Sequence, residues 1–226
     1  MKKIIKNELS GWKSCEVIWL LLACSIIAGL SIYWGDNLMG IISATTGVAC
    51  VVCTGKGKLS AYLFGLVNCV LYAIISYRAG YYGEVSFNVV SIPLQFVGFF
   101  TWLKHMDSET HEVKKRRMTN KGRLFLVSMI IICTLLYGNL LNMINGNMPF
   151  IDSFTTVASM IAMIISVMMY SEQWYMWLVV NSVSIVLWVV NLMNGTDNWA
   201  TLLMWLVFWI NSVINLIKWE KEAKGK

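Results

Sequence analysis

The sequence predicts an all-α polytopic membrane protein, on three observations. Of its 226 residues, 58% are hydrophobic and only 13% are charged, whereas an average soluble domain carries about 25% charged residues. Cutting the chain at every Asp, Glu, Lys and Arg leaves eight uncharged stretches of 19 or more residues, and a membrane-spanning helix needs about 20 apolar residues. The basic residues collect in alternate linkers. Together these features argue against a soluble globular protein.

Each of the eight uncharged stretches is predicted to form one transmembrane helix. The longest charged segment between them, 104–123, is too short to build a soluble core of its own. The basic start of the chain leads into a full-length apolar run, so it predicts a retained first span rather than a signal peptide. The predicted spans are 17–35, 37–55, 59–77, 85–103, 124–151, 153–171, 173–196 and 198–217.

The distribution of positive charge predicts the orientation of these spans. With the N-terminus in the cytoplasm, 17 of the 18 Lys and Arg residues fall on the cytoplasmic side and only Arg78 falls outside. Both termini are then cytoplasmic. The basic run 114–117 is more typical of a cytoplasmic loop that contacts lipid headgroups than of a nucleic-acid site. The cytoplasmic set is Lys2, Lys3, Lys6, Lys13, Lys56, Lys58, Lys104, Lys114, Lys115, Arg116, Arg117, Lys121, Arg123, Lys218, Lys221, Lys224 and Lys226, and the predicted outer turns carry Asp36, Glu84, Asp152 and Asp197.

The residues that usually carry catalysis are scattered. His105 and His111 lie in the charged linker, and Cys50-x-x-Cys53 lies within a span without a second pair of ligands. No phosphate-binding glycine loop, paired carboxylates or nucleophile motif is present in the sequence. The sequence therefore predicts neither an enzyme nor a metal or cofactor site.

An internal repeat is visible in the spacing of polar residues. Thr45–Thr46 precede Phe64-x-x-x-Asn68 in the next span, and Thr155–Thr156 precede Trp177-x-x-x-Asn181 in the same way. Each unit then ends in a span with an amide, Gln95 in the first and Asn211 in the second. Since duplicated helix bundles are typical of transporters, the repeat favours a transport function.

Each repeat holds three spans, and one additional span between them lets both repeats start on the outer side. The sequence thus predicts a 1+3+1+3 arrangement with two parallel three-helix repeats joined by a linker helix. Its parts are an N-terminal extra helix (1–36), the first repeat (37–104), a charged cytoplasmic loop with the linker helix (105–145), and the second repeat with a basic cytoplasmic tail (146–226).

Polar residues within the spans recur at helical spacing. Trp177, Asn181, Ser184 and Trp188 share one face of span 173–196, and Asn88, Ser91, Gln95 and Phe99 share one face of span 85–103. Amides can donate and accept hydrogen bonds, and indoles stack on flat or cationic rings, so these faces predict a site for a flat, polar, mostly uncharged solute. The alternative is that the amides only join helices. Tryptophans near span ends are predicted to be interfacial anchors: Trp12, Trp34, Trp102, Trp174, Trp199 and Trp219.

Three segments resemble the PnuC-type vitamin transporters. They are Gly55-Lys-Gly-Lys-Leu-Ser-Ala-Tyr-Leu-Phe-Gly-Leu-Val-Asn68, the run 82–102 with Pro93-Leu-Gln-Phe, and Glu172-Gln-Trp-Tyr-Met-Trp-Leu-Val-Val-Asn181. The resemblance covers most of the chain beyond Asn37. It implies a SWEET-like fold, a homotrimer, and uptake of nicotinamide riboside by facilitated diffusion across the bacterial inner membrane, with a cytoplasmic kinase trapping the substrate.

The resemblance also implies roles for individual residues. Trp177 would stack on the substrate ring and Asn181 would hydrogen-bond to it, with further amides from Gln95 and Asn211. The first-repeat counterparts are Phe64 and Asn68, and the spacing adds Trp188, Asn88 and Ser184 to the candidates. Thiamine or riboflavin transport on the same scaffold, and a sensor or scaffold that transports nothing, stay open as alternatives. We expect uniport, because the predicted span interiors contain no carboxylate that could carry a proton.

Overall fold

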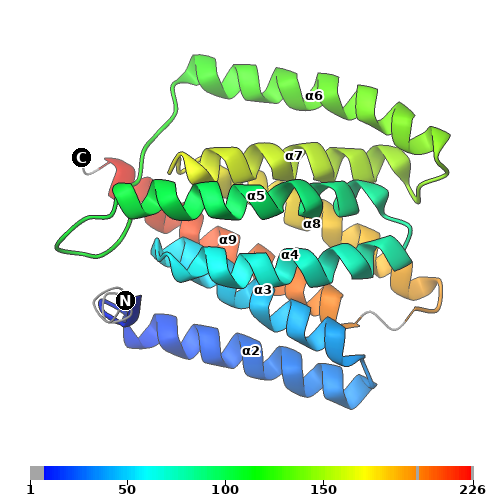
Figure 1. The fold of residues 1–226 in the computed structure, drawn as a ribbon, viewed down its shortest axis with the longest axis horizontal. Coiled ribbons are helices and arrows are strands. Elements are labelled where there is room, and N and C mark those ends of the chain that lie inside the picture. The colour runs from blue at the N-terminus through cyan, green and yellow to red at the C-terminus, as the bar shows by residue number, and fades with distance from the viewer. Residues whose placement is uncertain (1–7, 197–198, 225–226) are drawn as a thin grey trace.

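Eight long helices dominate the computed structural model, which describes residues 8–196 and 199–224 (Figure 1). Each is long and apolar enough to cross a membrane, and the described residues contain no β-strand beyond two isolated bridges. The predicted all-helical membrane fold is therefore confirmed. The helices are α2 (Ser14–Trp34), α3 (Leu38–Lys56), α4 (Ser60–Arg78), α5 (Tyr82–Lys104), α6 (Asn120–Met143), α7 (Pro149–Val167), α8 (Gln173–Met193) and α9 (Trp199–Lys224).

Local capping sets several helix ends. The side chain of Asn37 accepts the backbone N–H of Gly40 at 2.8 Å and starts α3. The hydroxyl of Thr119 accepts from Gly122 at 3.3 Å, so α6 begins at Asn120, before the predicted start at 124. Gly35 and Gly57 end α2 and α3 with φ of +75° and +80°, in the left-handed conformation that glycine adopts most readily.

The predicted outer turns are wrong for two carboxylates. Helices α5 and α7 begin before the predicted starts at 85 and 153, so Glu84 and Asp152 lie inside their first turns and are 1% and 0% exposed. The reason is a contact between the two helices. The carboxylate of Asp152 accepts the backbone N–H groups of Gly83 at 2.8 Å and Glu84 at 3.1 Å. It thereby caps the N-terminus of α5 from the neighbouring helix.

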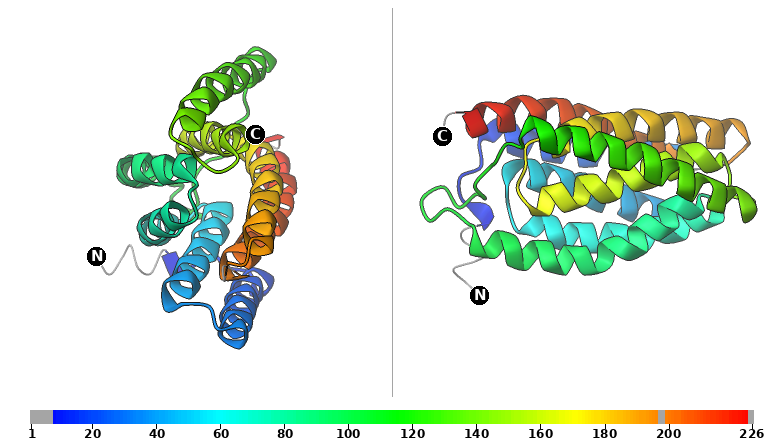
Figure 2. Two further views of the ribbon diagram at one scale, coloured as in Figure 1. Left: turned by 90° about the vertical axis from the view of Figure 1, so that its right-hand side faces the viewer. Right: turned by 90° about the horizontal axis from the view of Figure 1, so that it is seen from above.

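Six of the helices form a closed ring. Going round it, α3 contacts α4, then α5, α7, α8 and α9, and α9 contacts α3 again. We call α3–α5 the first triplet and α7–α9 the second triplet. Helix α2 packs outside the ring on α3 and α9, and α6 packs on α7, so these two helices lie at opposite edges of the bundle (Figure 2). In this ring each helix of the first triplet has the same order of neighbours as the corresponding helix of the second triplet. The 1+3+1+3 division and its boundaries stay predictions.

The outward faces of the peripheral helices carry large apolar side chains. Ile18 and Leu21 on α2 are 62% and 61% exposed, and Leu124 and Leu136 on α6 are 70% and 69% exposed. An exposed apolar surface of this extent is unfavourable in water and is the normal exterior of a helix in lipid.

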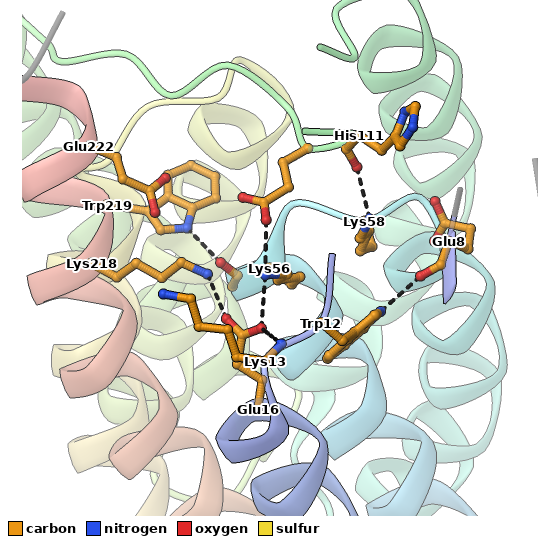
Figure 3. Close-up of polar contacts among 12 residues, drawn as sticks. Glu8, Trp12, Lys13, Glu16, Lys56, Lys58, His111, Lys218, Trp219 and Glu222 are labelled. Carbon is orange, nitrogen blue, oxygen red and sulfur yellow. Dashed lines mark hydrogen bonds and ion pairs between the residues drawn. The ribbon is translucent and has the colours of Figure 1, made fainter. Parts of the chain in front are cut away.

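Helix α2 begins and α9 ends at the same end of the bundle (Figure 1), and charged side chains form ion pairs there. Lys56, at the end of α3, is 5% exposed and pairs with Glu16 of α2 at 2.8 Å and with Glu112 of the 105–119 linker at 2.9 Å. Lys218 of α9 also binds Glu16, at 3.1 Å (Figure 3). This cluster joins the extra helix, both triplets and the linker.

The basic run 114–117 takes part in these contacts. Lys115 is 6% exposed and binds Glu112 at 2.8 Å and Glu222 at 2.6 Å, and Arg117 lies 3.3 Å from Glu220. Lys114 also lies 3.8 Å from Asp107, so three of the four basic residues are engaged by carboxylates of the protein itself. The predicted cytoplasmic residues Lys2, Lys3, Lys6 and Lys226, and the predicted outer-turn residue Asp197, lie outside the described residues.

Candidate functional site

A cavity with a volume of about 110 Å³ lies inside the ring. All six ring helices contribute to its lining, and the peripheral helices α2 and α6 do not. A single water molecule needs a volume of about 10–15 Å³ on the same measure. The cavity is therefore large enough for several waters or part of a small organic molecule.

Five of the nine residues predicted for the site line this cavity. They come from both triplets: Asn68 from α4, Asn88 and Gln95 from α5, and Trp177 and Asn181 from α8. The amide-rich faces predicted on α5 and α8 thus point at the same space. Whether these residues bind a ligand stays a prediction.

The other four predicted residues lie elsewhere. Phe64 is 38% exposed on the outer surface of α4. Ser184 and Trp188 are fully buried but lie outside the lining. The amide of Asn211 donates to the backbone oxygen of Val51 at 3.0 Å, so this side chain joins α9 to α3.

One face of α5 supplies a continuous polar stripe to the cavity. Glu84, Asn88, Ser91 and Gln95 follow one another at intervals of four, three and four residues, and each is at most 7% exposed. The side-chain nitrogen of Gln95 lies 3.5 Å from the sulfur of Cys69. This close packing depends on Gly65, because a Cβ at that position would lie 2.7 Å from the Gln95 amide nitrogen.

Asn181 is held with only part of its amide satisfied. Its nitrogen donates to the hydroxyl of Ser212 on α9 at 2.9 Å, and that hydroxyl donates to the backbone oxygen of Phe208 at 2.8 Å. The side-chain oxygen of Asn181 is buried without a hydrogen-bond partner among the described residues. The amide is therefore fixed in orientation with a free acceptor.

Unpartnered polar atoms converge on the cavity. Buried donors and acceptors are nearly always hydrogen-bonded in proteins, so an orphaned group commonly marks the place of a ligand or water. Within the part of the chain that the structure describes, five lining side chains carry such an atom. They are the Tyr62 hydroxyl, Glu84 Oε1, Ser91 Oγ, Trp174 Nε1 and Asn181 Oδ1.

Four aromatic side chains pack together at the end away from the charged cluster, and two of them, Tyr72 and Trp205, line the cavity. In this Tyr72 cluster (Tyr72, Tyr81, Trp188 and Trp205), the hydroxyl of Tyr72 accepts the indole N–H groups of Trp188 at 2.8 Å and Trp205 at 3.1 Å. Tyr81 donates to the backbone oxygen of Leu187 at 2.9 Å. Trp188 thus positions Tyr72, which lines the cavity.

A second aromatic cluster lies at the other end, next to the charged cluster. Tyr62, Trp102, Trp174 and Trp219 form this Trp102 cluster, with ring centroids 5.1 Å apart for Tyr62 and Trp102 and 5.8 Å apart for Trp174 and Trp219. The prediction that its three tryptophans are interfacial anchors is wrong, because they are 0%, 2% and 0% exposed. Trp34 and Trp199 are 39% and 38% exposed at helix ends.

Two indoles of the Trp102 cluster bridge the triplets. Trp102 of α5 donates to the backbone oxygen of Ser166 on α7 at 3.2 Å, and Trp219 of α9 donates to the backbone oxygen of Gly55 on α3 at 2.9 Å. Each triplet thus supplies a donor to the first helix of the other triplet.

Sequence reasoning missed several lining residues. Glu84 lies four residues before Asn88, so extending the polar stripe by one turn would have found it. Tyr62, Tyr72 and Ser212 have no comparable signal, because aromatic and small hydroxyl residues are common throughout these spans. The expectation that no carboxylate lies in the span interiors is wrong for Glu84.

Comparisons with known proteins agree on one family. The model of the nicotinamide mononucleotide transporter family matches residues 37–221. The nicotinamide riboside transporter PnuC of Neisseria mucosa is 39% identical over 97% of this chain and 86% of that protein. The protein of the same name from Haemophilus influenzae is 33% identical over 97% of this chain and 96% of that protein.

A solved structure has the same fold. The crystal structure of the vitamin B3 transporter PnuC matches with a TM-score of 0.87 and 38% sequence identity, and the match covers 97% of this chain and 96% of that one. The resemblance seen in the sequence is thereby confirmed.

Proposed function

Because the chain belongs to the nicotinamide mononucleotide transporter family, we propose that it takes up nicotinamide riboside across the bacterial membrane that its helices span. The observation that carries this proposal is the convergence of five unpartnered polar atoms on a cavity enclosed by six helices. Such a cavity suits a small ligand with several hydrogen-bonding groups and a flat ring. A transport role, rather than catalysis, is the function that this site supports.

The composition of the lining favours the riboside over its phosphorylated form. A phosphate group carries negative charge and is normally bound by Arg, Lys or backbone N–H groups. The lining residues include no Lys, Arg or His, and they do include the carboxyl of Glu84. A mononucleotide would therefore bring uncompensated negative charge into the cavity, whereas a nucleoside would not.

The predicted roles of the lining residues fit such a ligand. Trp177 offers an indole face for stacking on the nicotinamide ring. The free oxygen of Asn181 can accept from an amide or hydroxyl, and the amide of Gln95 can both donate and accept. These assignments rest on the family resemblance and on the position of the side chains around the cavity.

We further propose alternating access between the two aromatic clusters, in a protein whose termini are cytoplasmic and which lies in the inner membrane as a homotrimer. The triplets would rock about the cavity and part first at one cluster and then at the other. Facilitated diffusion stays part of this proposal. Only the family resemblance supports facilitated diffusion. Because Glu84 is a buried carboxyl in the cavity lining, uniport no longer follows from an absence of carboxylates in the spans.

Uptake by reconstituted protein tests the function. Proteoliposomes would be loaded with buffer and given labelled nicotinamide riboside, thiamine or riboflavin in parallel. We expect downhill uptake of nicotinamide riboside that saturates, that unlabelled nicotinamide riboside inhibits and that an imposed pH gradient does not drive uphill. Uptake of thiamine or riboflavin alone would indicate the alternative substrates, and binding without flux would indicate a sensor or scaffold.

A further inference from the structure

Glu84 is a buried acid in the lining of the cavity. It is 1% exposed, and its Oε1 atom has no hydrogen-bond partner among the described residues. None of the ion pairs formed by the described residues includes Glu84 or the neighbouring Asp152. A buried carboxylate without a cation is costly, so Glu84 is stable here either with a proton or next to a compensating positive charge.

The groups that face Glu84 do not supply that charge. Asp152 lies next to it and is itself acidic, although its carboxylate is engaged by the backbone N–H groups of residues 83 and 84. Thr155 places its hydroxyl by the carboxyl of Glu84, and Tyr72 and Tyr81 lie within electrostatic range. All three of these side chains are neutral when they carry their protons, so the described groups around Glu84 include acids and dipoles but no base.

The aromatic surroundings favour a cation as well. Tyr72 and Trp205 line the same cavity as Glu84, and the faces of phenol and indole rings attract positive charge. When Glu84 is ionised, its carboxylate and these electron-rich ring faces form a site of net negative potential in an otherwise uncharged cavity. In a cavity of low dielectric constant such an attraction acts over several ångströms, because it falls only with the inverse of distance.

We propose that Glu84 makes the cavity selective for positively charged ligands by supplying the countercharge to the pyridinium ring of the substrate. This inference rests on the proposed function, since nicotinamide riboside carries a permanent positive charge on the ring nitrogen that bears the ribose. Glu84 need not touch the ring. Its role is to make a cation more favourable in the cavity than a neutral molecule of the same shape.

A pair of ligands that differ in charge tests this role. Nicotinamide riboside is a cation, and its reduced dihydro form is neutral with nearly the same size and hydrogen-bonding groups. Binding of both to the purified protein would be measured by calorimetry for wild type, Glu84→Gln and Glu84→Asp. Glu109→Gln is the matched control, because this exposed residue of the 105–119 linker loses the same charge far from the cavity lining.

We expect wild type to bind the cation at least about tenfold more tightly than the neutral form. Glu84→Gln should weaken binding of the cation by at least about tenfold and change binding of the neutral form less than about threefold. Glu84→Asp and Glu109→Gln should keep the preference for the cation. Equal weakening of both ligands in Glu84→Gln would overturn the proposal and make Glu84 a structural residue.

The wild-type protein alone also decides the question if Glu84→Gln does not fold. Binding of nicotinamide riboside with no preference over its neutral form would overturn the role of Glu84 and leave the proposed function intact. Binding of neither form would overturn the proposed function itself, and the inference with it.

Discussion

The indole N–H of Trp188 donates to the hydroxyl oxygen of Tyr72 at 2.8 Å, between two side chains that are 0% and 3% exposed. Tyr72 accepts a second indole N–H, from Trp205, at 3.1 Å. One phenol oxygen on α4 thereby satisfies donors from α8 and α9, and it holds the first triplet to the second at this end of the cavity.

Replacing Tyr72 by Phe should therefore destabilise the protein. The substitution keeps the ring but leaves two buried indole donors without an acceptor, each at a cost of about 1–3 kcal/mol. We expect a clear decrease in the melting temperature of the purified protein in detergent. Tyr175→Phe is the control, because Tyr175 is 48% exposed. Equal melting temperatures for the two variants would show that the Tyr72 hydroxyl contributes no net stability.

Replacing Asn181 by Ala should weaken ligand binding, whereas replacing Asn211 by Ala should lower the stability of the protein. Asn181 lines the cavity and offers a free acceptor, whereas Asn211 is not a lining residue and donates to the backbone oxygen of Val51. We expect Asn181→Ala to weaken nicotinamide riboside binding by about tenfold or more, which corresponds to about 1.4 kcal/mol. Asn211→Ala should instead lower the melting temperature and leave the dissociation constant within about threefold of wild type. The reverse pattern would place the ligand next to Asn211.

Replacing Gly65 by Ala should weaken ligand binding indirectly, by displacing the side chain of Gln95. The Cβ of Gly65→Ala would lie 2.7 Å from the amide nitrogen of Gln95 and 2.8 Å from its oxygen, so this amide must move. We expect weaker binding of nicotinamide riboside, similar in size to that of Gln95→Ala. Gly29→Ala on α2 is the control, because no atom lies within 4 Å of its added Cβ. Wild-type affinity for Gly65→Ala would show that the position of the Gln95 amide does not matter.

The charged cluster should lose stability in acid. Burial opposes ionisation of Glu112, but its hydrogen bond and charge interaction with Lys115 and its hydrogen bond with Lys56 hold the pKa of this carboxyl below its usual value of 4.5. Since the folded-state pKa is the lower one, the stabilisation is present above pH 4.5 and is lost as the pH falls below that value.

Glu112→Gln separates this contribution from the rest of the acid response. We expect the variant to melt at a lower temperature than wild type near about pH 7, and the difference to shrink toward about pH 3.5. Glu109→Gln, in the same linker but exposed, should follow wild type throughout. A difference between Glu112→Gln and wild type that stays constant across this range would exclude titration of Glu112 as the cause.

Charge and hydropathy were sufficient to predict the number and approximate position of the spans, but not every helix end, since α9 continues through the charged residues 218–224. Glu84 and Asp152 lie within helices because of a tertiary contact, in which a carboxylate of α7 caps the N-terminus of α5. No pattern within either helix contains that information. The three buried tryptophans of the Trp102 cluster escaped prediction for a similar reason, since an anchor and a packed indole occupy the same position along a span.

The polar stripes of α5 and α8 were predictable because residues three and four apart share a helix face. The rotation of each helix about its own axis was not. Trp177 and Phe64 occupy matching positions in the predicted repeat, yet Trp177 lines the cavity and Phe64 is exposed on the surface. Spacing defines a face, and only the packing of neighbouring helices decides where that face points.

The reciprocal bonds of Trp102 and Trp219 make separation of the triplets at their end of the molecule a cooperative event. Parting the two triplets there would leave two buried indole donors without partners in the same movement. Breaking one bond while keeping the other would gain little solvent access and would still cost a full hydrogen bond. Under the proposed alternating access, that end of the molecule would therefore favour a closed and an open state over partly open forms.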